Sequence, residues 1–331
     1  MITTYGTNQT IAPYPEADIP LSWKISTLTA VLVSPIIAIL GLVGNILSIV
    51  AIVKSGWKKP SNVLLTCLCV ADSLVLLSAF NVPRMIAFLS ERETSYCNIW
   101  DFNDSISYIF YVITLALRFL FSYGVKLSSG IVTLITLERF IAVFFPLKLV
   151  SVITARRLFV AVLVLVIVWI PWPLYLLSHY TFVYSYYPEW RVYAGSALFN
   201  PNTLYTSLHL YAAIPLALYV PFLIVTSGSI LIATKLHFTL KKRKSMVLSS
   251  SNKESSKTTK ILISVCAVFA ITKAASVLEY LADLSGQSDD SKNTNIVLES
   301  VIFILDLLNS SSNFVVFVTI NTNFKTLFKF R

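Results

Sequence analysis

Seven long stretches of this chain consist mainly of apolar residues and carry few charges. A helix that crosses the hydrocarbon core of a membrane needs about 20 such residues. The stretches lie at residues 25–53, 62–89, 107–145, 158–178, 206–233, 261–281 and 296–320. A membrane β-barrel would instead show strands of about ten residues with alternating polarity. The sequence therefore predicts an all-α membrane protein, a bundle of seven transmembrane helices.

The composition excludes a soluble globular protein. Hydrophobic residues make up 56% of the chain and charged residues 13%, whereas soluble domains carry roughly 25% charged residues. The formal net charge is +10, and the predicted loops carry it in alternation, acidic or neutral loops being followed by basic ones. Basic loops stay on the cytoplasmic side, so we expect the N-terminus outside and the C-terminus inside. The positive charge therefore indicates the orientation of the chain in the membrane, and no nucleic-acid partner is expected.

The same pattern divides the chain into three parts. Residues 1–24 form an extracellular segment, residues 25–320 the seven-helix domain and residues 321–331 a short cytoplasmic tail. No cleavable signal peptide is expected, because the first span can direct its own insertion. The sequons at Asn8 and Asn103 fall on the predicted outer side, where the chain can be glycosylated.

Asp72 lies in the middle of the second stretch, where an ionisable group is costly and usually faces the bundle interior. One interpretation is a structural polar contact with a neighbouring helix. The other is an ion or switch site, because a carboxylate with hydroxyl and amide oxygens suits Na⁺ or a proton. Polar residues of other spans that could complete the site are Asn45, Ser128, Asn309, Ser310 and Asn313.

Glu138 and Arg139 stand where the third stretch meets the predicted cytoplasm. They are either an ordinary interfacial ion pair, which contributes little when exposed, or a lock at the inner mouth of the bundle. In the second case, breaking the pair would expose Arg139 to a partner.

Several short patterns occur in the spans in a fixed order. They are Gly44-Asn45, Leu68-Cys69-Val70-Ala71-Asp72, Glu138-Arg139-Phe140, Trp169, Pro221 and Asn309-Ser310-Ser311-Ser312-Asn313-Phe314. Together they resemble the rhodopsin-like (class A) family of G-protein-coupled receptors. Residues 137–148 are similar to the corresponding stretch of invertebrate FMRFamide-type peptide receptors and molluscan chemosensory receptors.

This resemblance implies a plasma-membrane receptor that binds an extracellular peptide or small chemosensory ligand and activates a heterotrimeric G protein. It implies that Asp72 and its polar neighbours line a sodium pocket, and that Glu138 and Arg139 form an ionic switch. The expected G-protein surface comprises Arg139, Pro146, Lys148, Lys241, Lys242, Arg243 and Lys244. The basic run would also suit anionic membrane lipid.

The chain departs from the family pattern at several positions. The second extracellular loop, residues 178–205, has no cysteine, and Thr114 stands where the third span usually has one. Lys273 and Ala275 stand near the place of the aromatic-x-Pro element in the sixth span. These departures leave open a divergent receptor that lacks normal G-protein coupling.

The expected ligand pocket lies in the outer half of the bundle. Phe121 occupies the position of the amine-binding aspartate of amine receptors, which disfavours an amine ligand. No lysine lies between Val301 and Asn321, so no retinal is expected. The candidate lining residues are Arg118, Phe121, Ser122, Lys273, Glu279, Tyr280 and Asp306.

The charges of this pocket allow two interpretations. Arg118 and Lys273 either pair with Asp306 or Glu279 inside the bundle, or bind an acidic group of the ligand through charge-assisted hydrogen bonds. The aromatic-rich segment 180–193 either anchors the chain at the membrane interface or covers the pocket as a lid.

Two other classes of function are disfavoured. A small-solute transporter would use Asp72, Arg118, Lys126, Lys273 and Asp306 as a charged path. An enzyme is not expected, because the chain has three histidines and no His-Glu-x-x-His pattern.

Overall fold

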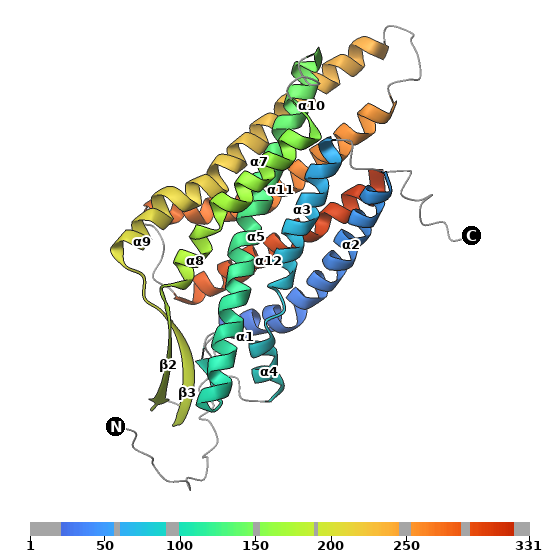
Figure 1. The fold of residues 1–331 in the computed structure, drawn as a ribbon. Helices are drawn as coiled ribbons and strands as arrows, with labels where there is room; N and C mark the ends of the chain where they lie inside the picture. The colour runs from blue at the N-terminus through green and yellow to red at the C-terminus, as the bar shows by residue number, and fades with distance from the viewer. Residues whose placement is uncertain are drawn as a thin grey trace, which may run out of the picture.

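The computed structural model describes residues 21–55, 60–90, 99–147, 153–188, 191–244, 253–285 and 292–320. Within these residues seven helices are long and apolar enough to cross a membrane, and they form one elongated bundle (Figure 1). They span Lys24–Lys54, Pro60–Leu89, Asp104–Phe144, Ala155–Leu177, Thr203–Lys235, Ser264–Leu281 and Ile296–Asn313. The predicted seven-helix fold is confirmed.

The first two spans are built from shorter pieces. The first consists of α1 (Leu21–Leu28), the π-helical η1 (Thr29–Val33) and α2 (Ser34–Ser55). The second is interrupted between α3 (Pro60–Leu77) and α4 (Val82–Leu89). Asn81 caps α4 by accepting from the backbone N–H of Arg84, and Pro83 fits the first turn because its missing N–H would have no helical partner there.

The third span is the unbroken helix α5 (Asp104–Phe144), which contains 41 residues. Its inner charged residues do not interrupt it: Arg118, Lys126 and Arg139 are partly buried, and Glu138 is buried. α5 packs very closely on α3, since a Cβ at Gly124 would lie 3.0 Å from the backbone nitrogen of Val75. Small residues permit this kind of approach between membrane helices.

The remaining spans complete the bundle. The fourth joins α7 (Ala155–Trp169) to α8 (Pro171–Leu177), and the fifth joins α9 (Thr203–Leu208), η2 (His209–Ala213), η3 (Pro215–Tyr219) and α10 (Val220–Lys244). The sixth and seventh are α11 (Lys253–Ser285) and α12 (Lys292–Ile320). The π-helical turns of η2 and η3 are separated by Ile214, and η3 begins at Pro215, which removes a backbone hydrogen bond from the helical ladder.

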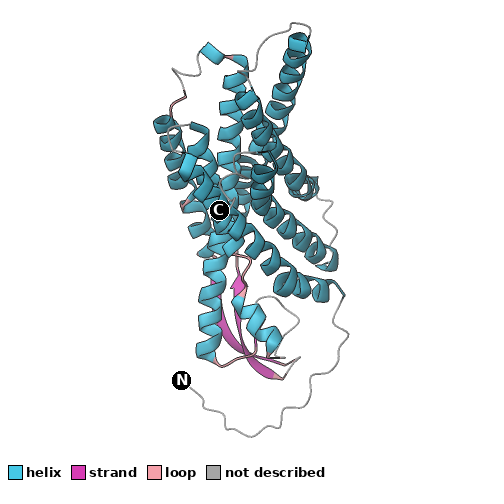
Figure 2. Ribbon diagram, turned by 90° about the vertical axis from the view of Figure 1, so that its right-hand side faces the viewer, coloured by secondary structure: helices cyan, strands magenta, loops and turns pink. Residues whose placement is uncertain are grey.

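A small sheet at one end of the bundle was not foreseen from the sequence. Strands β2 (Tyr180–Tyr187) and β3 (Val192–Phe199) form an antiparallel hairpin, and β1 (Ile99–Trp100) adds to β3, so the order is β1-β3-β2. The segment is rich in tyrosine, valine and phenylalanine, which favour strands. Figure 2 shows this sheet beside one end of the helices, which we call the hairpin end.

At the opposite end, α10 and α11 extend past the other helices (Figure 1). The bundle is thus different at its two ends: a sheet packs on one, and two long helices project from the other.

Candidate functional site

A cavity of about 450 Å³ lies near the hairpin end, between α5, α11 and α12. Its lining includes five of the seven pocket residues expected from the sequence: Arg118, Phe121, Ser122, Glu279 and Asp306. Phe121 of α5 packs on Phe303 of α12, with ring centroids 5.2 Å apart. The predicted lining of this pocket is therefore brought together, although the residues come from three distant segments.

Arg118 is oriented by the hairpin. Its guanidinium carbon lies 4.9 Å from the ring centre of Tyr180 in β2, a cation–π contact. Glu299 of α12 also lines this cavity, is exposed to solvent and attracts Arg118 electrostatically. Tyr180 and Glu299 were not among the candidate residues, because nothing in the linear order indicates that a strand and the start of α12 meet α5 here.

A second cavity of about 220 Å³ lies farther from the hairpin end and shares Glu279, Ile302 and Asp306 with the first. Lys273 and the buried Tyr280 of α11 line it, as expected for a pocket wall. Tyr280 ties α11 to η2, because its hydroxyl donates to the carbonyl oxygen of Leu210 at 3.3 Å.

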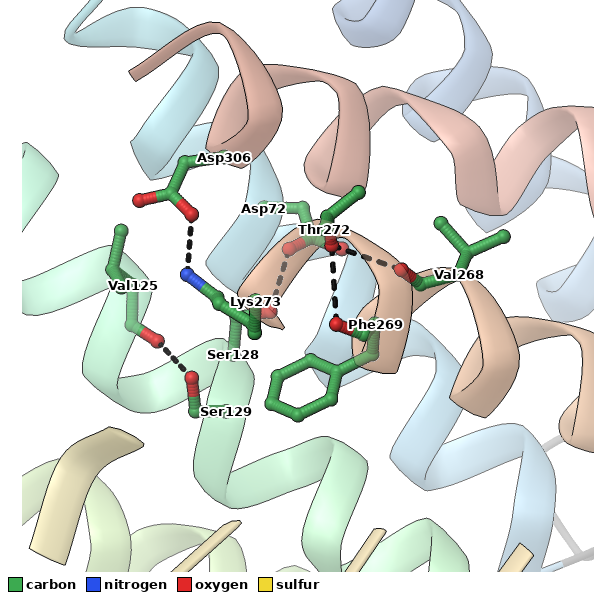
Figure 3. A network of polar contacts seen from close by, with 9 residues as sticks. All are labelled: Asp72, Val125, Ser128, Ser129, Val268, Phe269, Thr272, Lys273 and Asp306. Carbon is green, nitrogen blue, oxygen red and sulfur yellow. Dashed lines mark hydrogen bonds and ion pairs between the residues drawn. The ribbon is translucent and has the colours of Figure 1, made fainter. Parts of the chain in front are cut away.

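Lys273 forms a buried ion pair with Asp306. The two atoms Nζ and Oδ1 are 2.5 Å apart, and both side chains are almost inaccessible to solvent. Figure 3 shows the lysine of α11 pointing directly at the carboxylate on α12. Of the two pairings that the sequence left open for Lys273, the one with Asp306 is therefore present.

The second cavity also contains Lys126 and His209, which the sequence analysis did not place in the ligand pocket. A signal for Lys126 was available, because it follows Arg118 and Ser122 at intervals of four residues and so shares their helix face. For His209 there was no such signal, since its direction depends on the π-helical turn of η2.

Asp72 is completely buried and lies at the centre of a polar network that joins α3, α5 and α12. Ser128 donates to Asp72 Oδ1 at 2.7 Å, and the amide of Asn313 donates to Oδ2. Ser310 also bonds to the carboxylate. Figure 3 shows the bond to Ser128 a short distance from the Lys273–Asp306 pair.

Asn45 extends this network into α2. Its amide nitrogen donates to the carbonyl oxygen of Ser310 at 3.2 Å, and its amide oxygen is buried with no hydrogen-bond partner among the described residues. Asn309 is also buried, and its carbonyl oxygen accepts from Ser312. A buried carboxylate beside hydroxyl oxygens and an unpaired amide oxygen is a set that fits Na⁺.

Glu138 and Arg139 form a cluster with Ser61 of α3, far from the hairpin end. The carboxylate oxygen Oε1 of Glu138 accepts from Ser61 Oγ at 2.9 Å and lies 3.1 Å from the guanidinium of Arg139, which also donates to Ser61. The side chains are 12% exposed for Arg139 and 6% for Glu138. The ion pair is therefore present and largely buried, and Ser61 of α3 bonds to both residues.

The other candidate residues lie at the surface or outside the described residues. Pro146 is exposed just after α5. Asn103 is exposed and caps α5 by accepting from the backbone N–H of Ile106. Residues 241–244 belong to α10. Asn8, Lys148 and the tail 321–331 lie outside the described residues.

Comparisons with known proteins agree with this architecture. The family model of seven-transmembrane receptors of the rhodopsin family matches residues 44–316. Thyrotropin-releasing hormone receptors of Mus musculus and Homo sapiens are each 30% identical over 156 residues, which are 47% of this chain and 34% of the relative. A candidate G-protein coupled receptor of Caenorhabditis elegans is 29% identical over 136 residues, or 40% of this chain and 29% of the relative. The match thus spans about a third of the curated relatives' length.

Proposed function

We propose that this chain, which belongs to the rhodopsin family of seven-transmembrane receptors, binds an extracellular ligand and activates a heterotrimeric G protein. The seven apolar helices and the family make it a multi-pass protein of the plasma membrane. In this proposal the ligand shifts an equilibrium between two arrangements of the bundle, because it binds one of them more tightly.

The observation that carries the proposal is the pair of adjoining cavities, of about 450 and 220 Å³, which share lining residues between α11 and α12. Ligand sites are typically concave and mostly apolar, with a few convergent polar groups. Here Phe121, Phe303 and Ile302 supply apolar surface, and Arg118 and Lys126 supply charge. The β2–β3 hairpin contributes Tyr180 against Arg118, in keeping with a lid over the larger cavity.

A peptide is the ligand class that we favour. The relatives named above include receptors for thyrotropin-releasing hormone, and residues 137–148 resemble those of FMRFamide-type peptide receptors. The likeness of the same stretch to molluscan chemosensory receptors supports a small chemosensory cue as the second candidate. Nothing among the described residues resembles a metal cluster of catalytic type, and no enzymatic activity is proposed.

The G protein would engage the end of the bundle that carries Arg139. In the arrangement described here Ser61 and Glu138 hold this guanidinium against α3. Activation would release Arg139 toward the cleft between the helices. Pro146, Lys148 and residues 241–244 would provide the rest of the docking surface.

A G-protein activation assay in transfected cells, screened with neuropeptides and odorants, tests the proposal. A peptide should activate the wild type, and Arg139→Ala should abolish the response at equal surface expression. Arg156→Ala removes an exposed arginine near the same end and should respond normally. Silence toward the whole panel at full surface expression, or an undiminished response of Arg139→Ala, would contradict the proposal. Substrate flux without G-protein activation would favour a transporter instead.

A further inference from the structure

Lys126 is a cation inside the bundle without a counter-ion among the described residues. Its Nζ donates to the carbonyl oxygen of Ser122 at 3.2 Å and to Ser122 Oγ at 2.9 Å. Both acceptors are neutral and belong to the preceding turn of the same helix. An ammonium group away from water is costly unless an opposite charge accompanies it, so this position is unfavourable in the ligand-free protein.

The nearest acid is already engaged. The charges that act on Lys126 are those of Lys273 and Asp306, and Asp306 is bound to Lys273 at 2.5 Å. Glu279 also lines the cavity, but it follows Lys273 by six residues on α11, about 9 Å along the helix toward the hairpin end. Of the two lysines that line the cavity, Lys273 is therefore bonded to a carboxylate, and Lys126 is bonded to neutral oxygens.

His209 adds a second polar group to the same cavity wall. Its ring is stacked against Trp172 at 5.7 Å and against Tyr205 at 5.4 Å, with interplanar angles of 6° and 12°. The stacking fixes the direction of the ring, and Nδ1 is buried with no partner among the described residues. A neutral imidazole with Nδ1 protonated would donate from this position.

We propose that the receptor's ligand carries a carboxylate that enters the 220 Å³ cavity and pairs with Lys126, with His209 Nδ1 as a second donor. This inference rests on the proposed receptor function and names the chemistry of its ligand. A carboxylate completes the hydrogen bonding of both groups, and charge-assisted bonds are stronger where water is excluded. Lys273 engages the carboxylate of Asp306, and the place beside Lys126 is left for the ligand.

The carboxylate can belong to a peptide, at its C-terminus, or to a small organic acid. The two sources share the same chemistry at Lys126 and differ in size. A small acid fits the inner cavity alone, whereas a peptide would continue into the 450 Å³ cavity, past Asp306 toward Arg118.

The first experiment needs no ligand. Thermal unfolding of the purified full-length protein in detergent compares the wild type with Lys126→Met and Lys273→Met. Lys126→Met should raise the Tm, because methionine keeps most of the side-chain volume and removes the unpaired charge. Lys273→Met should lower the Tm, because it leaves Asp306 buried and alone. A Tm of Lys126→Met at or below the wild-type value would overturn the proposal.

The second experiment measures ligand-induced stabilisation with defined probes. They are N-acetylphenylalanine, its amide, the tetrapeptide Gly-Gly-Gly-Phe and its C-terminal amide. At least one free acid should stabilise the wild type, and its amide should not. Lys126→Met should weaken the apparent affinity by about tenfold or more, and Lys126→Arg should retain most of it.

The outcomes distinguish a peptide ligand from a small organic acid. They also distinguish a failure of the carboxylate site from a failure of the proposed receptor function. Stabilisation by the small acid alone indicates an organic acid, and stabilisation by the tetrapeptide indicates a peptide. Equal effects of acids and amides, no stabilisation by either acid, or full affinity in Lys126→Met would overturn the carboxylate site. Because no G protein is present, this failure is distinct from a failure of receptor signalling.

Discussion

At the scale of single residues, the buried charges of this bundle are accommodated in three ways. Lys273 has a carboxylate partner in Asp306. Asp72 has neutral donors, the hydroxyl of Ser128 and the amide of Asn313. Among the described residues, Lys126 bonds only to the neutral oxygens of Ser122. Such groups are expensive inside a membrane and mark functional positions, and the incomplete neutralisation of Asp72 and Lys126 makes them the natural places for an ion and a ligand.

The proposed Na⁺ site at Asp72 leads to a test of ion-dependent stability. An ion that binds only the folded protein raises its stability in proportion to the logarithm of its concentration. Replacing NaCl by choline chloride should therefore lower the Tm of the wild type and leave that of Asp72→Asn unchanged. The measurement is thermal unfolding in detergent at constant ionic strength.

A control is Glu299→Gln, which neutralises an exposed carboxylate outside this network. It should retain the sodium dependence of the wild type. If Asp72→Asn kept the full dependence, the ion would have to bind elsewhere.

At the scale of elements, the β2–β3 hairpin is held to α5 by direct packing. The Ser107 hydroxyl donates to the carbonyl oxygens of Trp100 and Phe102, and Tyr111 donates to the carbonyl oxygen of Tyr180 at 3.0 Å. Rings of Phe182 and Tyr108 pack edge to face at 5.4 Å. The contacts of Tyr111 and Tyr108 attach the second loop to the third span, whereas those of Ser107 attach the segment of β1. The family usually joins the second loop to the third span by a disulfide bond.

Gly195 of β3 is required for this close approach. A Cβ at this position would lie 2.3 Å from Ser107 Cβ, which is far below van der Waals contact. Gly195→Ala should displace the hairpin and cost about 1–3 kcal/mol of stability, with weaker ligand binding because Tyr180 moves with β2. Thermal unfolding and ligand titration measure both effects.

Gly130→Ala serves as the matched control. The atoms that its Cβ would meet belong to the flexible side chain of Leu165, at 3.0 Å and beyond. It should therefore be much milder than Gly195→Ala. Equal effects of the two substitutions would show that the hairpin does not depend on this contact.

At the scale of the whole molecule, the bundle has chemically different ends. The larger cavity lies near the end where the sheet packs. Arg139 is close to the C-terminal end of α5, and α10 and α11 project from the end opposite the sheet (Figure 1). The basic loops of the sequence connect helices at the second end. The positive-inside rule predicts that this end is cytoplasmic, which would place the cavities on the extracellular side.

This orientation predicts the accessibility of inserted epitope tags. A tag before residue 21 should be detected by antibody on intact cells. A tag between residues 244 and 253 should be detected only after the cells are permeabilised. The reverse pattern would contradict the proposed topology and, with it, the assignment of the two ends.

The amino-acid sequence by itself determined the number of spans, their approximate limits and five of the residues that line the larger cavity. These properties are local, because a run of apolar residues long enough to cross a membrane must satisfy its own backbone hydrogen bonds as a helix. The periodicity of α5 likewise brought Arg118, Phe121 and Ser122 to one face. The motif at residues 309–314 of α12 indicated which polar residues lie around Asp72.

Only the tertiary structure decided which charges are paired. Lys273 had two possible acids, and the packing of α11 on α12 selected Asp306. Arg118 acquired Tyr180 as a neighbour because a hairpin forms in the second loop, and His209 joined the cavity wall because a π-helical turn directs it there. Contacts of this kind depend on the relative positions of segments that are far apart in the chain. The linear pattern of polar and apolar residues does not encode those positions. The free charge of Lys126, which defines the proposed ligand chemistry, becomes visible only after every other pairing is known.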